Sequence, residues 1–254
     1  MAVAADATRS SAQPGRGALA ERRFYTGYTL AILIAIVIGF APSFFLRGLV
    51  EPFGPLKPLR PAVLVHGVVT TAWILLFPLQ AWLISAGRRG LHLQLGKVGF
   101  ALGAAMTVTA YIVAMGLYRE PAAPPLTPAL TVVLPLTDVM TLCVLLPLAW
   151  VRRLDAQAHK RLMLVIGCLL CGAAIFRLPI WNRADLAGIF VIHLALYATL
   201  APLWLWDWRT RGRLHRATVL GSGILAVDMF GRLLIAQTAA WAALVRILPG
   251  FGTP

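Results

Sequence analysis

Six ionisable side chains lie inside long apolar stretches of this 254-residue sequence, and they are its best candidates for chemistry. They are His66, Asp138, Arg177, His193, Asp228 and Arg232. A titratable side chain within a membrane-spanning stretch is costly, so it usually faces the interior of a helix bundle and serves function. All six fall in the outer half or near the middle of their stretches. The sequence therefore predicts one interior polar site that opens toward the outer face.

Two histidines at matching depth on separate helices have the chemistry of a bis-imidazole haem b site. His66 and His193 are the predicted axial ligands, because a neutral imidazole offers one nitrogen to each axial position of the iron. Arg177 and Arg232 are predicted to pair with the haem propionates, whose charge would otherwise be uncompensated at membrane depth. The two aspartates, Asp138 and Asp228, would set the local charge.

The same six groups fit two other interpretations. They could form the pathway of a proton or small-solute transporter. They could also form a purely structural network, with Asp228 paired to Arg232, Asp138 paired to Arg177, and the histidines bonded to backbone or hydroxyl groups. These three alternatives stay open at the level of the sequence.

A second set of histidines precedes three of the apolar stretches and lies next to arginine and lysine. Three imidazoles at one level could bind a metal ion or a second haem, since three-histidine metal sites are common. Histidines beside basic residues at a membrane surface also anchor helices and meet anionic lipid headgroups. The candidate metal ligands are His92, His159 and His215.

The elements that must position these side chains are seven apolar runs. They span residues 24–46, 62–85, 98–117, 129–151, 162–180, 187–207 and 218–246. Each is close to or above the length of about 20 residues that an α-helix needs to cross a bilayer core. The chain is 59% hydrophobic and 13% charged, with a mean hydropathy of +0.80, which is typical of an integral membrane protein in contact with the lipid bilayer.

The net charge of +14 is explained by membrane topology. Fifteen of the 23 lysines and arginines fall in the N-terminal tail and in the connections that share its side of the membrane. Positive charge accumulates on the cytoplasmic side, so the N-terminus is predicted to be cytoplasmic. Nucleic-acid binding is excluded as the reason for the charge.

The predicted organisation is a disordered cytoplasmic tail (1–23), one seven-helix transmembrane domain (24–248) and a short outer tail (249–254). No lysine lies within a predicted span, which excludes a retinal Schiff base. The sequence also lacks a P-loop, an HExxH zinc motif and a GxSxG nucleophile elbow. ATP-driven transport and serine hydrolysis are therefore unsupported.

Four segments resemble a family of uncharacterised bacterial multi-spanning inner-membrane proteins. These segments are His66-Gly67 with Trp73, Phe77 and Gln80; Leu91-His92 with Leu95-Gly96; His159 to Met163; and Asp207 with Arg211 to His215. The resemblance covers about residues 24–240 and implies a bacterial inner-membrane protein without a settled activity. Leu93-Gln94 and Arg216 depart from the family pattern.

Taken together, the sequence predicts an all-α, single-domain bundle of about seven transmembrane helices. The leading functional hypothesis is a haem-b electron-transfer protein or a quinone-linked redox subunit, with quinone or a redox protein as its partner. The rivals are a small-solute or proton transporter and a membrane assembly or scaffold protein without catalysis.

Overall fold

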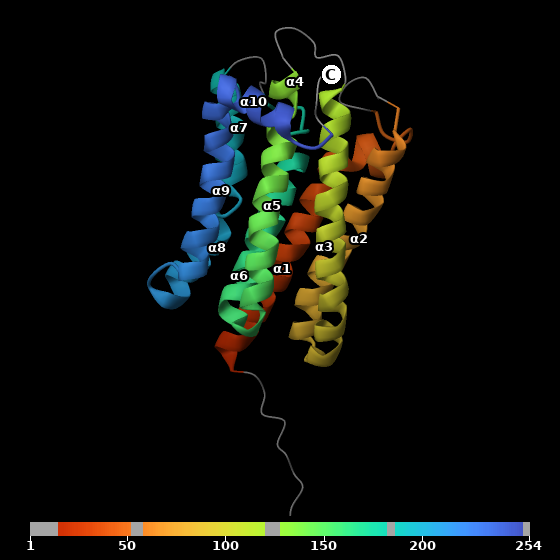
Figure 1. The fold of residues 1–254 in the computed structure, drawn as a ribbon. Coiled ribbons are helices and arrows are strands. Elements are labelled where there is room, and N and C mark those ends of the chain that lie inside the picture. Colours follow the sequence, from red (N-terminus) through yellow and green to blue (C-terminus); the bar gives the residue numbers. More distant parts are fainter. Residues whose placement is uncertain (1–14, 52–57, 120–127, 182–185, 251–254) are drawn as a thin grey trace, which may run out of the picture.

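All seven predicted apolar runs form helices that are long and apolar enough to cross a membrane. The computed structural model describes residues 15–51, 58–119, 128–181 and 186–250, and no β-strand occurs within those ranges. The helices pack side by side as one all-α bundle, which confirms the predicted fold class (Figure 1).

Within the described ranges, ten α-helices build the bundle and its outer end. They are α1 (Arg16–Phe40), α2 (Pro61–Ser85), α3 (Arg89–Tyr118), α4 (Pro128–Thr131), α5 (Val133–Val151), α6 (Ala156–Ile175), α7 (Leu186–Ala198), α8 (Ala201–Arg211), α9 (Arg216–Ile235) and α10 (Ala239–Ile247). A π-helical turn, Ala41–Phe45, extends α1. We call the lower end of the bundle in Figure 1 the basic end, predicted to be cytoplasmic, and the upper end the outer end.

The first helix begins earlier than the sequence predicts. Residues 16–23 were predicted to be a disordered tail, yet α1 starts at Arg16, while residues 1–14 lie outside the described residues. Tertiary contacts hold this polar extension at the basic end. Glu21 forms an ion pair with Lys160 of α6, and Arg22 donates a hydrogen bond of 3.1 Å to the carbonyl of Ser85.

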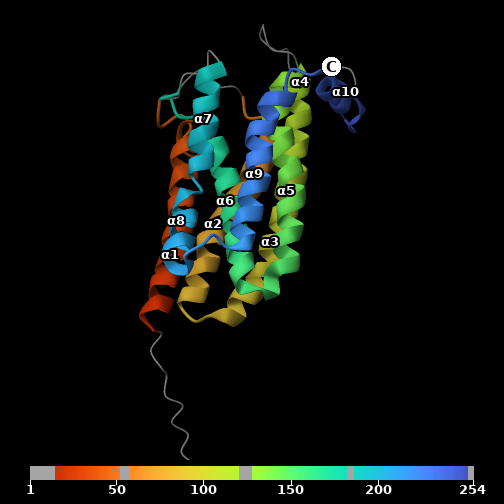
Figure 2. The same cartoon turned by 90° about the vertical axis from the view of Figure 1, so that its left-hand side faces the viewer.

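Two predicted spans are divided. The sixth span consists of α7 and α8, which lie nearly in line with a break at Thr199 and Leu200 (Figure 2). Pro202 in the first turn of α8 lacks the N–H that would continue the helix ladder. The seventh run ends at Ile235, and its remainder forms the short helix α10 beside α4 at the outer end (Figure 1). Trp241 of α10 fixes this position by donating 2.8 Å to the carbonyl of Ala129.

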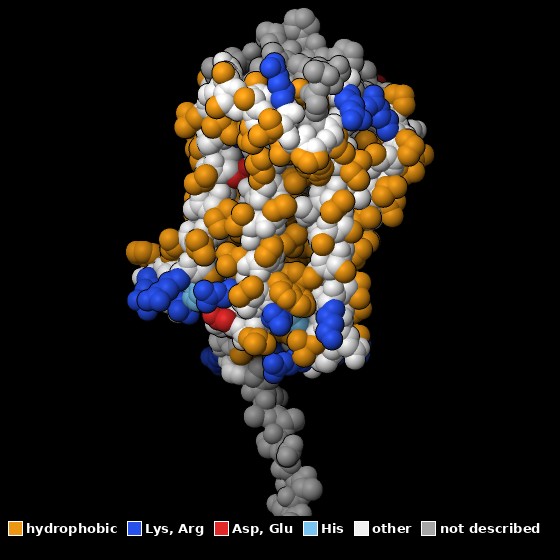
Figure 3. Space-filling view, viewed as in Figure 1, with side chains coloured by type: hydrophobic (Ala, Val, Ile, Leu, Met, Phe, Trp, Pro, Cys, Tyr) orange, Lys and Arg blue, Asp and Glu red, His pale blue; other side chains and the backbone are white. Residues whose placement is uncertain are grey.

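Helix α6 lies at the centre and packs against α1, α5, α7 and α9. At Gly39 the backbone of α1 comes so close to Ala174 of α6 that a Cβ atom would overlap the Ala174 backbone. Large apolar side chains cover the outside of the bundle, among them Val227 and Leu234, which are 75% and 78% exposed (Figure 3). This surface suits lipid, so the protein is an integral membrane protein.

Candidate functional site

Four of the six predicted side chains meet at one level in the outer half of the bundle. Asp138 comes from α5, His193 from α7, and Asp228 and Arg232 from α9; we call them the outer cluster. His193 and Asp228 each lie seven residues from the outer end of their helix, and Asp138 lies five residues from the start of α5. A rise of 1.5 Å per residue puts all three about 8–10 Å below the helix ends.

Arg232 is the centre of this cluster. Its Nη2 atom donates 2.6 Å to Oδ1 of Asp138 and also contacts Oδ2 of Asp228. Its Nε atom donates 3.0 Å to the backbone carbonyl of Asp228. The side chains of Arg232 and Asp228 are 4% and 2% exposed, whereas that of Asp138 is 30% exposed. The cluster therefore reaches the surface through Asp138, near the seam between α5 and α9.

His193 is the fourth member and is 1% exposed. Its Nδ1 atom lies 2.8 Å from the carbonyl of Ile189, one turn earlier on the same helix. Only a protonated Nδ1 can donate to that carbonyl, so in the neutral ring Nε2 carries a lone pair. The charges of Arg232 and Asp228 both act on this ring. The imidazole thus has an unprotonated Nε2 atom and lies within range of the charges of Arg232 and Asp228.

Two acceptor atoms of the cluster have no hydrogen-bond partner among the described residues. They are Nε2 of His193 and Oδ1 of Asp228. Buried polar atoms in proteins are normally hydrogen-bonded, so an unpartnered pair within one cluster calls for a reason. Both atoms accept hydrogen bonds, and each would be satisfied by a group that brings a proton.

The formal charge of the cluster points the same way. When all three groups are ionised, two carboxylates and one guanidinium carry a net charge of minus one. A buried charge without compensation is costly in a low-dielectric interior. One proton, bound to a carboxylate or to His193, removes that cost.

Part of the structural pairing predicted from the sequence is confirmed. Asp228 pairs with Arg232, four residues away on the same helix face. The predicted pair of Asp138 with Arg177 is wrong, because Asp138 binds Arg232 instead. Arg177 follows the end of α6, donates 2.6 Å to the carbonyl of Ala173 and lies over the ring of Phe40 on α1, with 4.2 Å from Cζ to the ring centroid.

His66 lies apart from the outer cluster, on α2. Its Nδ1 atom is 3.0 Å from the hydroxyl of Thr109 on α3, and its Nε2 atom is 3.4 Å from the hydroxyl of Thr70. Both ring nitrogens are therefore already hydrogen-bonded. The charge that acts on this ring comes from Arg177, and not from the outer cluster.

The two predicted axial ligands consequently belong to different parts of the bundle. Figure 1 places α2 and α7 on opposite sides of the bundle. His66 bonds to Thr109 of α3, whereas α7, which carries His193, packs against α6 and α9. The arginines predicted for the propionates divide in the same way, Arg177 near His66 and Arg232 near His193. The structure thus gives the two histidines different polar neighbours, and the haem b site stays a prediction.

The break between α7 and α8 lies below His193. The carbonyl of Thr199 loses its helical partner there, and the hydroxyl of Tyr28 on α1 donates to it instead. The thiol of Cys168 on α6 is a second, weaker donor at 3.7 Å. Irregular backbone at membrane depth is tolerated where side chains satisfy it in this way. Interrupted spans of this kind form the ligand sites of many transporters.

A second buried ionic group, which the sequence pattern does not predict, lies at the basic end. Arg161 of α6 donates through Nε and Nη2 to Oδ1 of Asp207 on α8, at 2.9 and 2.5 Å. The other oxygen of Asp207 accepts from the hydroxyl of Thr218 and from the backbone N–H of His215, at 2.5 and 3.0 Å. Arg161 also donates to the carbonyl and side-chain oxygens of Gln157.

This group, the basic-end clamp, joins α6, α8 and α9. The side chains of Arg161 and Asp207 are 1% and 0% exposed, and both carboxylate oxygens of Asp207 have donors. In the sequence, Arg161 is one of the basic residues in the connection before the fifth apolar run, where positive charge indicates the cytoplasmic side. The available signal was Asp207 itself, the acidic residue that ends the sixth apolar run, next to a strongly basic connection. Unlike the outer cluster, the clamp is satisfied by its own residues and is structural.

The three histidines predicted as metal ligands do not gather into one ligand set. Within the described ranges no group of three or more histidine, cysteine or acidic side chains is placed to hold a metal ion. The Nδ1 atoms of His92 and His159 lie 3.3 and 3.0 Å from the carbonyls of Gln80 and Ala149. His215 caps α9, and its Nδ1 accepts from the N–H of Ala217. Each imidazole is therefore oriented by a backbone group, on the preceding α-helix for His92 and His159 and on α9 for His215.

Comparison with known proteins adds no further assignment. No protein-family model, curated protein or solved structure matches this chain.

Proposed function

We propose that this protein is a membrane carrier that binds and passes protons, alone or together with a small polar solute, through the outer cluster. The observation that carries the proposal is the cluster's composition. Two carboxylates share one arginine, and both His193 Nε2 and Asp228 Oδ1 are buried without a donor among the residues that the structure describes. Such a group takes up one proton to become neutral and can release it.

Two features of the surroundings support a pathway. Asp138 is partly exposed on the outside of the bundle, so the cluster is not sealed within the protein at this side chain. Toward the basic end, the buried face of α9 continues with Ser222, whose hydroxyl accepts 2.8 Å from Trp204 and whose carbonyl accepts 3.3 Å from Tyr197. Leu225, fully buried, separates Ser222 from Asp228. A proton can pass from Asp228 to Ser222 only if the helices move so that Leu225 no longer separates them. The break between α7 and α8 is the proposed hinge for this movement.

A haem bridging His66 and His193 is not part of this proposal, because the two rings lie in different parts of the bundle. The proposed location is the bacterial inner membrane, as the family resemblance of the sequence implies. A scaffold role remains the rival, and it predicts that the cluster contributes only to stability.

The test is proton flux in liposomes that contain the purified protein and an internal pH-sensitive dye. An imposed membrane potential should acidify the lumen. Asp228→Asn and His193→Gln should each lower the initial rate by about a hundredfold or more, the lower end of the effect usual for a positioned acid or base. Asp155→Asn is the matched control, since it removes a carboxylate at the basic end that lies outside the spans.

Infrared spectroscopy separates transport from a purely structural network. The wild-type protein should show a protonated carboxyl band that changes between acidic and alkaline pH and is altered in Asp138→Asn and Asp228→Asn. Folded protein with no such band, and with equal flux in wild type and cluster variants, would rule out the proposal. A titrating band without any flux would support proton binding and refute transport.

A further inference from the structure

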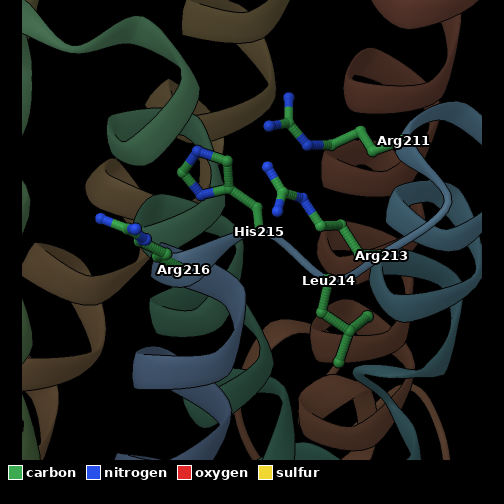
Figure 4. A pocket seen from close by; sticks show the side chains of 5 residues that line it. All are labelled: Arg211, Arg213, Leu214, His215 and Arg216. Carbon is green, nitrogen blue, oxygen red and sulfur yellow. The ribbon is translucent and has the colours of Figure 1, made fainter.

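A small basic pocket of about 200 Å³ lies at the basic end, in the turn between α8 and α9. It is lined by Arg211, Arg213, Leu214, His215 and Arg216. In Figure 4 the guanidinium groups of Arg211 and Arg213 approach the imidazole of His215, whereas the side chain of Arg216 extends the other way. Three nitrogen-bearing groups therefore converge on one space.

The two converging guanidinium groups have no acceptor within the part of the chain that the structure describes, since neither Arg211 nor Arg213 makes a side-chain hydrogen bond or ion pair there. The carboxylate of the nearby basic-end clamp does not pair with them. Both oxygens of Asp207 already accept hydrogen bonds from Arg161, Thr218 and the backbone N–H of His215. The pocket thus presents positive charge without an internal counter-ion.

The backbone fixes this geometry. Gly212 ends α8 with φ of +68°, a left-handed conformation that turns the chain sharply between the two arginines. His215 then starts α9, and its backbone N–H is held 3.0 Å from Asp207. Its Nδ1 accepts from Ala217, so the neutral ring carries its proton on Nε2 and has a donor available. Burial, and then the charges of Arg161 and Arg211, lower the pKa of His215 below its ordinary value, which favours this neutral tautomer.

We propose that Arg211, Arg213 and His215 bind the phosphate group of an anionic phospholipid headgroup at the basic end of the bundle. Two guanidinium groups match phosphate oxygens in geometry and charge, and the histidine N–H supplies a further donor. The pocket lies between the ends of the sixth and seventh candidate spans, at Arg211 and Arg216. Trp208, in the last turn of α8, is 64% exposed, and Leu214, which lines the pocket, is 37% exposed. Aromatic and basic residues together mark the headgroup level of a bilayer. This site is independent of the outer cluster and of proton passage.

The experiment compares lipid binding to the full chain in detergent, by native mass spectrometry and by titration with phosphatidylglycerol. At a salt concentration of about 1 M the Debye length falls to about 3 Å, so diffuse attraction is screened and direct contacts remain. Under these conditions Arg211→Gln/Arg213→Gln should weaken phosphatidylglycerol binding by about tenfold or more, as expected for the loss of charged hydrogen bonds.

The matched control is Arg89→Gln/Arg209→Gln, which removes two exposed charges at the same end of the bundle but none from the pocket. It should bind phosphatidylglycerol as the wild type does. Equal loss in both double variants would overturn the site, because it would show that attraction depends only on net charge. Phosphatidylcholine, which is not anionic overall, should not compete.

A second arm distinguishes a lipid headgroup from free phosphate. Inorganic phosphate is titrated into delipidated protein, and its binding is followed by calorimetry. Weak phosphate binding that phosphatidylglycerol displaces supports the proposal. Tight phosphate binding that the lipid cannot displace would overturn the lipid assignment and identify a site for a soluble phosphate compound. If the pocket variant binds neither probe differently from wild type, the proposal is wrong.

Discussion

Arg161 and Asp207 form an ion pair that is almost completely withdrawn from solvent, with Nε and Nη2 of the arginine 2.9 and 2.5 Å from one carboxylate oxygen. The other carboxylate oxygen of Asp207 accepts from Thr218 and from the backbone N–H of His215, and Nη1 of Arg161 donates to Gln157. The outer cluster has the opposite character, because its carboxylates outnumber its arginine. The bundle therefore contains one ionic group suited to hold helices together and one suited to exchange protons.

Removing the carboxylate of the clamp should destabilise the fold strongly. Asp207→Ala leaves the buried guanidinium of Arg161 without a counter-ion, and breaking a buried pair in this way costs about 3–5 kcal/mol. Thermal or chemical unfolding in detergent measures the loss. The double variant Arg161→Met/Asp207→Ala should recover much of it, because no buried charge is left alone. A loss below about 1 kcal/mol in Asp207→Ala would show that the pair is not buried as described.

The hydroxyl of Tyr28 should stabilise the break in the sixth span. Tyr28→Phe removes the main donor to the Thr199 carbonyl, which leaves a buried acceptor with only the distant Cys168 thiol, and an unsatisfied buried group costs about 1–3 kcal/mol. Unfolding measurements in detergent give the value. Tyr111→Phe is the control, since its hydroxyl makes an exposed hydrogen bond to the carbonyl of Pro249. Equal small losses in both variants would argue against a special role for Tyr28.

Two glycines of α1 should respond in opposite ways to alanine. A Cβ at position 39 would overlap the Ala174 backbone, so Gly39→Ala should separate α1 from α6 and destabilise the protein by about 1–3 kcal/mol, the usual cost of overpacking. A Cβ at position 27 meets nothing within 4 Å, so Gly27→Ala should stabilise the helix by about 0.5–1 kcal/mol. Comparison of the two unfolding midpoints tests both statements, and a stabilising Gly39→Ala would disprove the close approach.

Asp155 should make the free energy of unfolding depend on pH. The backbone N–H groups of Ala158 and Gln157 donate to its carboxylate at the start of α6 and hold the pKa of Asp155 below its ordinary value. The ionised group is thus favoured in the folded state. Its stabilisation is fully present above the ordinary pKa of about 4 and is lost as the pH falls through the lower folded-state value.

Asp155→Ala should therefore lose about 1 kcal/mol at neutral pH, as is usual for a helix N-cap, and lose progressively less as the solution becomes strongly acidic. Unfolding of the variant and the wild type in detergent across that range gives the difference. Asp155→Asn keeps an acceptor oxygen and should show a smaller loss with little pH dependence. If the stability difference between Asp155→Ala and the wild type instead became larger at acidic pH, the cap geometry would be contradicted.

The sequence by itself determined the membrane character and the number of spans. Runs of about 20 apolar residues can only be satisfied as helices in a bilayer, because each helix pairs its own backbone groups internally. It also identified the ionisable residues within the spans and the pairing of Asp228 with Arg232, since residues four apart on a helix share a face. Local spacing and composition suffice for each of these conclusions.

Only the tertiary structure decided which polar residues from different helices meet. Nearly every span is apolar all round, so the sequence carries no signal for which face points inward, and His66 and His193 could not be separated before the helices were packed. The same limit concealed the partner of Asp138 and the burial of Arg161. The break at Thr199 was hidden for a related reason: its freed carbonyl is satisfied by Tyr28, a residue 171 positions away in the chain. Side chains distant in sequence are brought within hydrogen-bonding distance by helix packing alone.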